Sequence, residues 1–89
     1  MSGLPPWRLS WSPLAIDDLA KLNDATTTRI RTAVRRLAET HQGDIKKLQG
    51  RHERWRLRVG DWRILFRFAR ETQSVIVLRV LNRRDAYRD

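Results

Sequence analysis

Five arginines lie at alternating positions of the two segments that flank Gly60-Asp61, in a stretch that otherwise consists mostly of apolar residues. A guanidinium group matches the paired oxygens of a phosphate or a carboxylate and stays charged at physiological pH. Arginines that share one side of a strand pair therefore suit the binding of a polyanion and the neutralisation of phosphate charge. The five residues are Arg54, Arg56, Arg58, Arg63 and Arg67.

The spacing predicts a β-hairpin over residues 53–69. Gly60 at the first position of a two-residue loop is typical of a type II′ turn, and this loop length places Arg58 opposite Arg63. The arginines then occupy one side of the hairpin. The other side is an apolar surface that must be covered, formed by Trp55, Leu57, Val59, Trp62, Ile64, Phe66 and Phe68. Trp55 and Trp62 are therefore expected in the core and not as platforms for stacked bases.

Two interpretations of the arginine side follow. Like charges opposed across a strand pair destabilise it by about 0.2–1 kcal/mol, so Arg58 opposite Arg63 favours a site that an anion normally fills. Alternatively, the arginines extend into solvent and protect the strands from aggregation. The presence of five on one side favours the anion site.

Composition predicts a single small domain. The 89 residues are 40% hydrophobic and include four Trp, enough for one core, which we place in residues 7–89 after a flexible lead at 1–6. The sequence has no Cys, and His41 and His52 lack the spacing of a metal site, so we expect them on the solvated surface and expect no metal or cofactor. It also lacks an apolar run of about 20 residues and a signal-peptide pattern, which predicts a cytoplasmic protein.

Charge points to the kind of partner. The net charge is +9, and of the 19 basic residues only Lys21, Lys46 and Lys47 are lysines. Such a balance implies a polyanionic partner, whether nucleic acid, an acidic protein, or each in turn.

Two helices are expected after a first strand at residues 7–11, whose inward side chains would be Trp7, Leu9 and Trp11. Ser12 and Pro13 suit the N-cap and first turn of a helix that ends near Asn23. Asp24 can cap a second helix over residues 25–40. Its inward stripe would be Ile30, Ala33, Val34 and Leu37. Its arginines, Arg29, Arg31, Arg35 and Arg36, are interpreted as a solvated face or as a supporting contact with RNA or an acidic partner.

The rest of the chain is expected to complete one sheet. Residues 43–50 are predicted as a loop anchored by Leu48, and residues 74–81 as a strand. That strand would turn Ile76, Leu78 and Val80 to the core and Arg79 to the arginine side, since burying its charge is costly. The resulting order β-α-α-β-β-β predicts an α+β fold, with a two-helix hairpin on one face of a mainly antiparallel four-stranded sheet.

Three segments carry a resemblance to a known family. They are Lys47–Gly50, Trp55–Phe66 and Val80–Tyr87, and their order is the most specific part of the match. The chain resembles the RelE branch of the RelE/ParE superfamily of type II toxin–antitoxin toxins. This resemblance implies a small toxin that enters the ribosomal A site, cuts mRNA there by attack of the 2′-hydroxyl, and is held inactive by a cognate antitoxin.

The same resemblance assigns roles to residues. It implies catalysis by Arg56, Arg58, Arg63, Arg83 and Tyr87, and we further expect RNA contacts from Lys46, Lys47, Arg54, Arg67, Arg79 and Arg84. Arginines can stabilise the extra charge of a phosphorane, but they rarely give up a proton. Tyr87 is thus the candidate for orienting or deprotonating the nucleophile. Tyr87 could instead pack on the sheet edge, and Arg83 could pair with Asp85.

Two other functions remain open at this point. One is a ParE-like inhibitor of DNA gyrase without nuclease activity, and the other is a non-catalytic nucleic-acid-binding module. The joint presence of Arg58, Arg63, Arg83 and Tyr87 favours the nuclease.

Overall fold

Two helices and five strands form the part of the chain that the computed structural model describes, residues 5–50 and 53–83. In chain order they are β1 (Arg8–Trp11), α1 (Pro13–Ala20), α2 (Asp24–Thr40), β2 (Ile45–Leu48), β3 (Arg54–Val59), β4 (Trp62–Ala69) and β5 (Ser74–Asn82). The strands make one sheet in the order β1-β5-β4-β3-β2, antiparallel except where β1 pairs with β5. The predicted α+β class is confirmed.

The sheet has five strands, so the predicted number of four is wrong. The additional strand is β2, which pairs antiparallel with β3 where a loop was expected. Its sequence, Ile-Lys-Lys-Leu, is too short and too weakly patterned to identify a strand by itself. Pairing with the already ordered β3 supplies the missing stabilisation, and it places Lys46 beside Arg56.

Both helices begin at capping side chains. The Ser12 hydroxyl accepts a hydrogen bond from the Ala15 N–H, as predicted. The cap of α2 is Asn23, whose side chain accepts from the Thr26 N–H, and not Asp24, which is the first helical residue. Because Asn23 caps the second helix, α1 ends at Ala20, earlier than expected.

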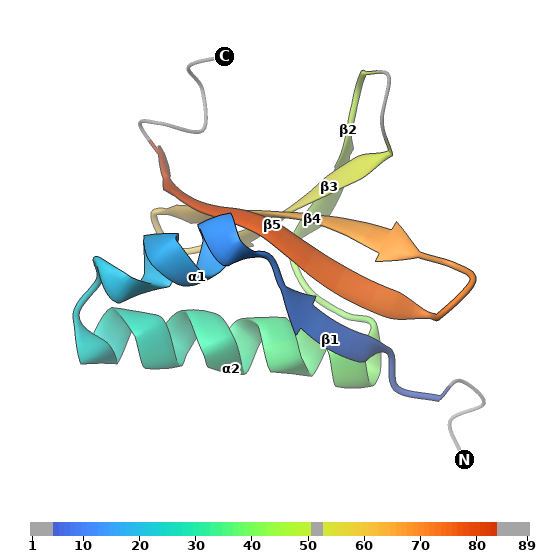
Figure 1. The fold of residues 1–89 in the computed structure, drawn as a ribbon, viewed down its shortest axis with the longest axis horizontal. Helices are drawn as coiled ribbons and strands as arrows, with labels where there is room; N and C mark the ends of the chain where they lie inside the picture. The colour runs from blue at the N-terminus through green and yellow to red at the C-terminus, as the bar shows by residue number, and fades with distance from the viewer. Residues whose placement is uncertain (1–4, 51–52, 84–89) are drawn as a thin grey trace.

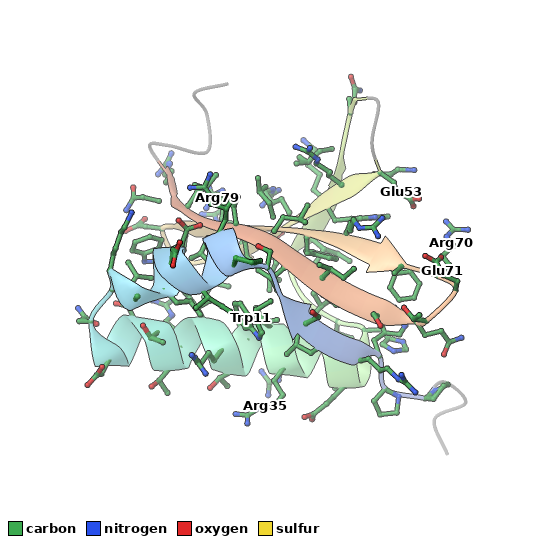
Figure 2. The ribbon with its side chains drawn as sticks, viewed as in Figure 1. Trp11, Arg35, Glu53, Arg70, Glu71 and Arg79 are labelled. Atoms are coloured by element: carbon green, nitrogen blue, oxygen red, sulfur yellow. The ribbon has the colours of Figure 1, made fainter. Side chains whose placement is uncertain are left out.

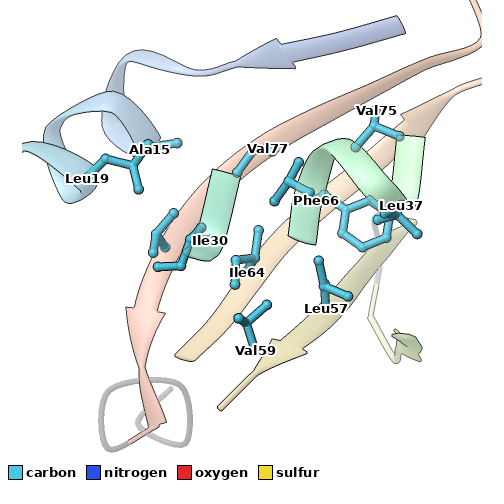
Figure 3. Close-up of a cluster of buried hydrophobic side chains, with 12 residues drawn as sticks. Ala15, Leu19, Ile30, Leu37, Leu57, Val59, Ile64, Phe66, Val75 and Val77 are labelled. Carbon is cyan, nitrogen blue, oxygen red and sulfur yellow. The ribbon is translucent and has the colours of Figure 1, made fainter. Parts of the chain in front are cut away.

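The core lies between the helices and one face of the sheet. Figure 1 shows α1 and α2 on the same side of the sheet, so neither helix covers the opposite face. Ile30, Val34 and Leu37 of α2 pack against the hairpin residues predicted to face inward (Figure 3). The most deeply buried side chains are Ile30, Leu37, Ile64, Val34, Val75 and Val77. Neither helix has the length and apolar character required to cross a membrane, within the residues described.

A β-bulge gives the first half of β5 the opposite orientation to the predicted one. Phe66 pairs with Val77 while its neighbour Leu65 pairs with Arg79, which leaves Leu78 as the extra residue. Consequently Val75 and Val77 face the core in place of Ile76 and Leu78, whereas Val80 is buried as predicted. Alternation along the sequence cannot reveal an inserted residue, so the predicted parity was wrong for the first half of this strand.

The N-terminal aromatics show two further differences. Trp7 stacks on His41 with ring centroids 3.9 Å apart and packs on Phe68, so the prediction of a solvated His41 is wrong. His41 ends α2 in a left-handed conformation (φ 60°), which turns its ring back toward Trp7. Leu9 remains 36% exposed, because β1 is an edge strand. His52 lies outside the described residues.

Candidate functional site

The β3–β4 hairpin has the predicted register. Arg58 lies opposite Arg63, and Val59 opposite Trp62, across a turn in which Gly60 has φ +59°. A positive φ at this first turn position, without one at Asp61, agrees with the type II′ geometry expected from the sequence. The turn thus fixes the guanidinium groups of two strands on one face of the sheet.

Cross-strand pairing extends this arginine face over several strands. One row runs from Lys46 through Arg56 and Leu65 to Arg79, and a second runs from Arg58 through Arg63 to Leu81. Arg54 and Arg67 follow the same alternation and are exposed. The arginine face, defined by Lys46, Arg54, Arg56, Arg58, Arg63 and Arg67, lies opposite the helices. Among the described strand residues on this face of the sheet, none is a carboxylate or a histidine.

Arg63 lies on this face, yet it is not the exposed side chain that the sequence led us to expect. It is only 4% exposed, and it is the buried charged residue of the described chain. Its Nη1 donates to the carbonyl oxygens of Gly60 at 3.4 Å and Trp62 at 3.3 Å. The guanidinium is therefore folded back on the turn, where carbonyl oxygens offset part of the cost of burying it.

Arg79 is held by a carboxylate at the sheet edge. Its Nε and Nη2 donate to the two carboxyl oxygens of Asp18 at 2.9 and 3.1 Å, and the same carboxylate accepts the Val80 N–H at 2.8 Å. Figure 2 shows Arg79 above β5 beside α1. Because β1 pairs only as far as Val77, Asp18 caps an edge that would otherwise lack a backbone partner.

The Asp18 carboxyl responds to this environment. Partial burial raises its pKa, but the hydrogen bonds from Arg79 and the Val80 N–H, together with the positive charges of Arg79 and Lys21, outweigh burial. The pKa of Asp18 is therefore held below its usual value of 3.8. Arg79 thus serves the fold, which separates it from the other residues predicted to contact RNA.

The remaining residues predicted for catalysis or RNA binding lie in different parts of the structure. Lys47 pairs with Trp55 on the helix side of the sheet, with its Nζ 5.9 Å from the Trp55 ring, so it does not join the arginine face. Arg83 is exposed, and its N–H donates to the Asp61 carbonyl at 2.6 Å, which brings it to the hairpin turn. Arg84 and Tyr87 lie outside the described residues.

Sequence reasoning missed the position of two arginines on α2. Arg29 and Arg36 line a hollow together with Arg58, next to the hairpin turn. The guanidinium of Arg29 is so close to Gly60 that a Cβ there would lie 2.9 Å from its Nη2. The signal was present in the sequence, because residues seven apart share a helix face, but it did not show that this face meets the hairpin.

The chemistry available to the arginine face is charge stabilisation. Guanidinium groups fixed before reaction can bind phosphate oxygens and stabilise a pentavalent phosphorane as its charge develops. Arg56 pairs with Lys46 in the first row, and Arg58 pairs with Arg63 in the second. A single phosphate can therefore contact donors from more than one strand. Proton transfer would need another group, since arginine rarely exchanges its proton.

A family model and several solved structures match most of this chain. A family model described as the ParE toxin of type II toxin-antitoxin system, parDE, matches residues 9–87. No curated protein matches the sequence.

Solved structures share the fold. The RelBE2 toxin–antitoxin complex from Mycobacterium tuberculosis superposes with a TM-score of 0.81 at 24% identity, covering 93% of this chain and 98% of that chain. The RelB–RelE antitoxin–toxin complex from Methanococcus jannaschii gives 0.71 at 26% identity, covering 88% and 94%. A YoeB/ParE toxin from Agrobacterium tumefaciens gives 0.69 at 22% identity, covering 84% and 96%.

Proposed function

Because the chain belongs to the RelE/ParE superfamily of type II toxin–antitoxin toxins, we propose that it is a ribosome-dependent endoribonuclease that cuts mRNA in the ribosomal A site. The observation that carries this proposal is the arginine face, where Arg58 opposes Arg63 and both neighbour further cations. An RNA backbone supplies the negative charge that this surface lacks. Figure 1 shows both helices on the other side of the sheet, so neither helix would block a large substrate from reaching this surface.

The proposed reaction divides the work between stabilisation and proton transfer. The 2′-oxygen attacks the adjacent phosphorus and forms the O2′–P bond, while the P–O5′ bond breaks. The 2′-hydroxyl proton passes to a base, and the departing 5′-oxygen takes up a proton. Arg56 and Arg58 would bind the backbone and the developing phosphorane charge. Tyr87 remains our predicted group for orienting or deprotonating the nucleophile.

Arg63 and Arg83 are proposed to clamp the scissile phosphate. Arg83 is exposed beside the turn and can reach an anion directly. Arg63 is buried, so its clamping role requires its guanidinium to leave the turn carbonyls when RNA binds. Two of the contacts that it would give up are the long hydrogen bonds to the Gly60 and Trp62 carbonyl oxygens, and a bidentate contact with phosphate is stronger than either one.

We also propose a cognate antitoxin as the protein partner. Two of the three solved structures described above are toxin–antitoxin complexes, from Mycobacterium tuberculosis and Methanococcus jannaschii. A chain with net charge +9 would favour an antitoxin segment rich in carboxylates.

A second candidate function is inhibition of DNA gyrase without RNA cleavage. The description of the matching family model names ParE, which favours this alternative. Such an inhibitor would bind a protein target and would not need several arginines gathered across adjacent strands. The arginine face therefore supports the nuclease more strongly than the gyrase inhibitor.

One experiment separates the two candidates. The 5′ ends of mRNA on translating ribosomes are mapped with the intact chain and with the Arg63→Ala and Tyr87→Phe variants, and gyrase supercoiling is assayed in parallel. Codon-phased cuts that disappear in both variants support the nuclease. Unbroken mRNA together with blocked supercoiling supports the gyrase inhibitor. If the chain neither cuts mRNA nor blocks supercoiling, the non-catalytic binding module is the remaining candidate.

A further inference from the structure

An apolar pocket of about 190 Å³ lies at the end of the sheet where β3 begins and β4 ends. It is on the helix side of the sheet, because Trp55 and Phe66 belong to the hairpin side chains that face the core. Aromatic rings form most of its wall, and its lining also includes a carboxylate and a guanidinium group. We define the aromatic pocket by Trp7, Trp55, Phe66, Phe68, Glu53 and Arg70.

The rings of the aromatic pocket are held in place by the fold. Trp7 stacks on His41 with ring centroids 3.9 Å apart, and its ring lies 4.6 Å from that of Phe68. Phe66 is buried, whereas the other rings of the pocket are only half-buried. The half-buried rings therefore keep part of their surface for a ligand, which meets side chains that are already ordered.

The polar groups of the aromatic pocket form an ion pair with each other. Arg70 Nη2 lies 3.3 Å from Glu53 Oε1, and the two side chains are 76% and 40% exposed. Figure 2 shows both residues at the same end of the sheet. An ion pair this exposed contributes little to stability, so a ligand can replace its contacts at small cost. The pair thus offers a carboxylate acceptor beside guanidinium donors, next to an apolar surface.

A second cation approaches the aromatic pocket from β2. Lys47 pairs with Trp55 across the two strands, and its Nζ lies 5.9 Å from the centroid of the Trp55 ring. Lys47 is exposed and does not belong to the arginine face. Positive charge from Lys47 and Arg70 can therefore hold the phosphates of a nucleic acid whose base enters the pocket.

Size and chemistry together select a nucleobase as the ligand. An apolar cavity of about 150 Å³ holds a benzene ring, so the aromatic pocket suits one flat ring system and is too small for a helix or a strand. Single-stranded nucleic acids bind by stacking bases on aromatic side chains and by placing phosphates against cations. An aliphatic side chain of a protein would use the rings but would make no use of Glu53 and Arg70.

The ion pair distinguishes among the bases. A carboxylate only accepts hydrogen bonds, and guanine presents two N–H groups side by side, at N1 and N2, with the O6 acceptor next to them. Glu53 can accept from both N–H groups with its two oxygens while Arg70 donates to O6. The Watson–Crick edges of adenine, cytosine and uracil each present a single donor group, so they use one carboxylate oxygen. Guanine is therefore the base that fits best.

We propose that the aromatic pocket binds a guanine base of single-stranded RNA. The base stacks on the half-buried rings, donates to Glu53 from N1 and N2, and accepts at O6 from Arg70. This contact lies on the opposite face of the sheet from the arginine face and takes no part in the proposed cleavage. It rests on the proposed function for the choice of RNA as the nucleic acid. It also gives Trp55, which the sequence placed in the core, a surface role.

Binding of short RNAs to the full-length chain tests this proposal. The probe is a fluorescein-labelled hexauridine in which one central residue is guanosine, and the comparison probes carry adenosine or inosine there. Inosine lacks the N2 amino group and keeps N1–H and O6. Glu53→Ala is compared with Glu71→Ala, which removes an exposed carboxylate outside the pocket. Trp55→Leu is compared with Trp11→Leu, the same change at a half-buried Trp of β1.

The expected results are specific to the base and to the pocket. The intact chain should bind the guanosine RNA at least about fivefold more tightly than the adenosine RNA, with the inosine RNA between them. Glu53→Ala should reduce the guanosine preference to within about twofold, and Glu71→Ala should keep it. Trp55→Leu should weaken the guanosine RNA by at least about fivefold relative to Trp11→Leu. Thermal melts establish that each variant folds, and Glu53 is exposed, so its comparison stands even if Trp55→Leu unfolds.

Several results would overturn the proposal. They are equal affinities of the intact chain for the guanosine and adenosine RNAs, a guanosine preference that survives Glu53→Ala, and similar losses in Trp55→Leu and Trp11→Leu. Absence of a base preference together with saturable binding of a blocked trileucine peptide would identify a site for apolar protein side chains instead.

The outcome is separate from that of the cleavage experiment. A chain that prefers guanosine RNA but leaves mRNA intact on the ribosome would refute the nuclease and keep the pocket assignment. A chain that cuts mRNA but binds the three RNAs equally would refute the pocket assignment and keep the nuclease.

Discussion

Arg79 and Arg58 are both arginines of the same sheet, but they have opposite surroundings. Arg79 is held by a bidentate contact with Asp18, which also accepts the Val80 N–H. Arg58 lies opposite Arg63, and among the described residues no carboxylate forms an ion pair with it. A cation neutralised within the fold stabilises the fold, whereas a cation left opposite another cation is available to an external anion. The following predictions test this difference.

The largest expected effect is on RNA cleavage. Arg58→Ala should lower the cleavage rate on translating ribosomes by about 10²–10³-fold, the range seen when one preorganised donor to a developing negative charge is removed. The combined change Asp18→Asn and Arg79→Gln removes the paired cation without altering net charge. It should leave the rate within about threefold of the intact chain. A similar loss in both proteins would end the distinction between the two arginines.

The free energy of unfolding should depend on the Asp18–Arg79 pair, although the cleavage rate should not. Asp18→Asn should lower the free energy of unfolding by about 1–2 kcal/mol near neutral pH, from the loss of charge-assisted hydrogen bonds. The figure is at the low end because Arg79 is 41% exposed and solvent screens the pair. Urea unfolding of the two proteins measures the difference, and an unchanged midpoint would show that Asp18 does not stabilise the sheet edge.

The Asp18 contribution should depend on pH with a definite sign. Its folded-state pKa lies below 3.8, so the folded chain binds the proton less readily than the unfolded chain does. The stabilisation is therefore fully present above the unfolded pKa and is lost as the pH falls through the folded one. The gap between the intact chain and Asp18→Asn should be constant from neutral pH down to about pH 5 and should close below 3.8. A gap that widens toward acid pH would contradict this assignment.

A smaller effect is expected at the hairpin. Replacing Arg58 by Gln removes repulsion from Arg63, so the free energy of unfolding should stay the same or rise by up to about 1 kcal/mol. Thermal melts at low salt measure this change, and high salt should reduce it by screening. A clear fall in melting temperature would mean that Arg58 is a structural residue.

The smallest effect is expected for the exposed pair between Arg70 and Glu53. Their side chains are 76% and 40% exposed, so solvent screens the 3.3 Å contact. Glu53→Gln should leave the melting temperature nearly unchanged, which makes it a matched control for Asp18→Asn. A loss comparable to that of Asp18→Asn would show that removing any carboxylate, and not this particular cap, weakens the fold.

The sequence predicted the hairpin because local signals agree there. Gly60 defines the turn, and the alternation of apolar and basic residues on both sides leaves a single register. The pairing of Arg58 with Arg63 and the inward position of Ile64 are both confirmed. The helix stripe of Ile30, Val34 and Leu37 was equally predictable from its period.

Features that depend on contacts between distant segments could not be predicted. The Asp18 contact with Arg79 joins residues at |i−j| = 61. The bulge at Leu78 depends on how β5 pairs with β4, which the alternation within β5 does not encode. The burial of Arg63 depends on its fold-back to the turn carbonyls, which alternation does not encode. The same limit applies to the hollow lined by Arg29, Arg36 and Arg58, because the helical period places Arg29 and Arg36 on one face of α2 without showing what that face contacts.

The most direct test of the difference between Arg58 and Arg79 is the salt dependence of RNA affinity. The logarithm of the association constant for a single-stranded RNA is measured against the logarithm of salt concentration, for the intact chain, for Arg58→Gln, and for Asp18→Asn with Arg79→Gln. Each phosphate contact on single-stranded RNA adds about 0.7 to the magnitude of the slope. We expect Arg58→Gln to reduce it by about that amount and the double variant to leave it unchanged. Equal slopes in all three proteins, or a reduction confined to the double variant, would contradict the account.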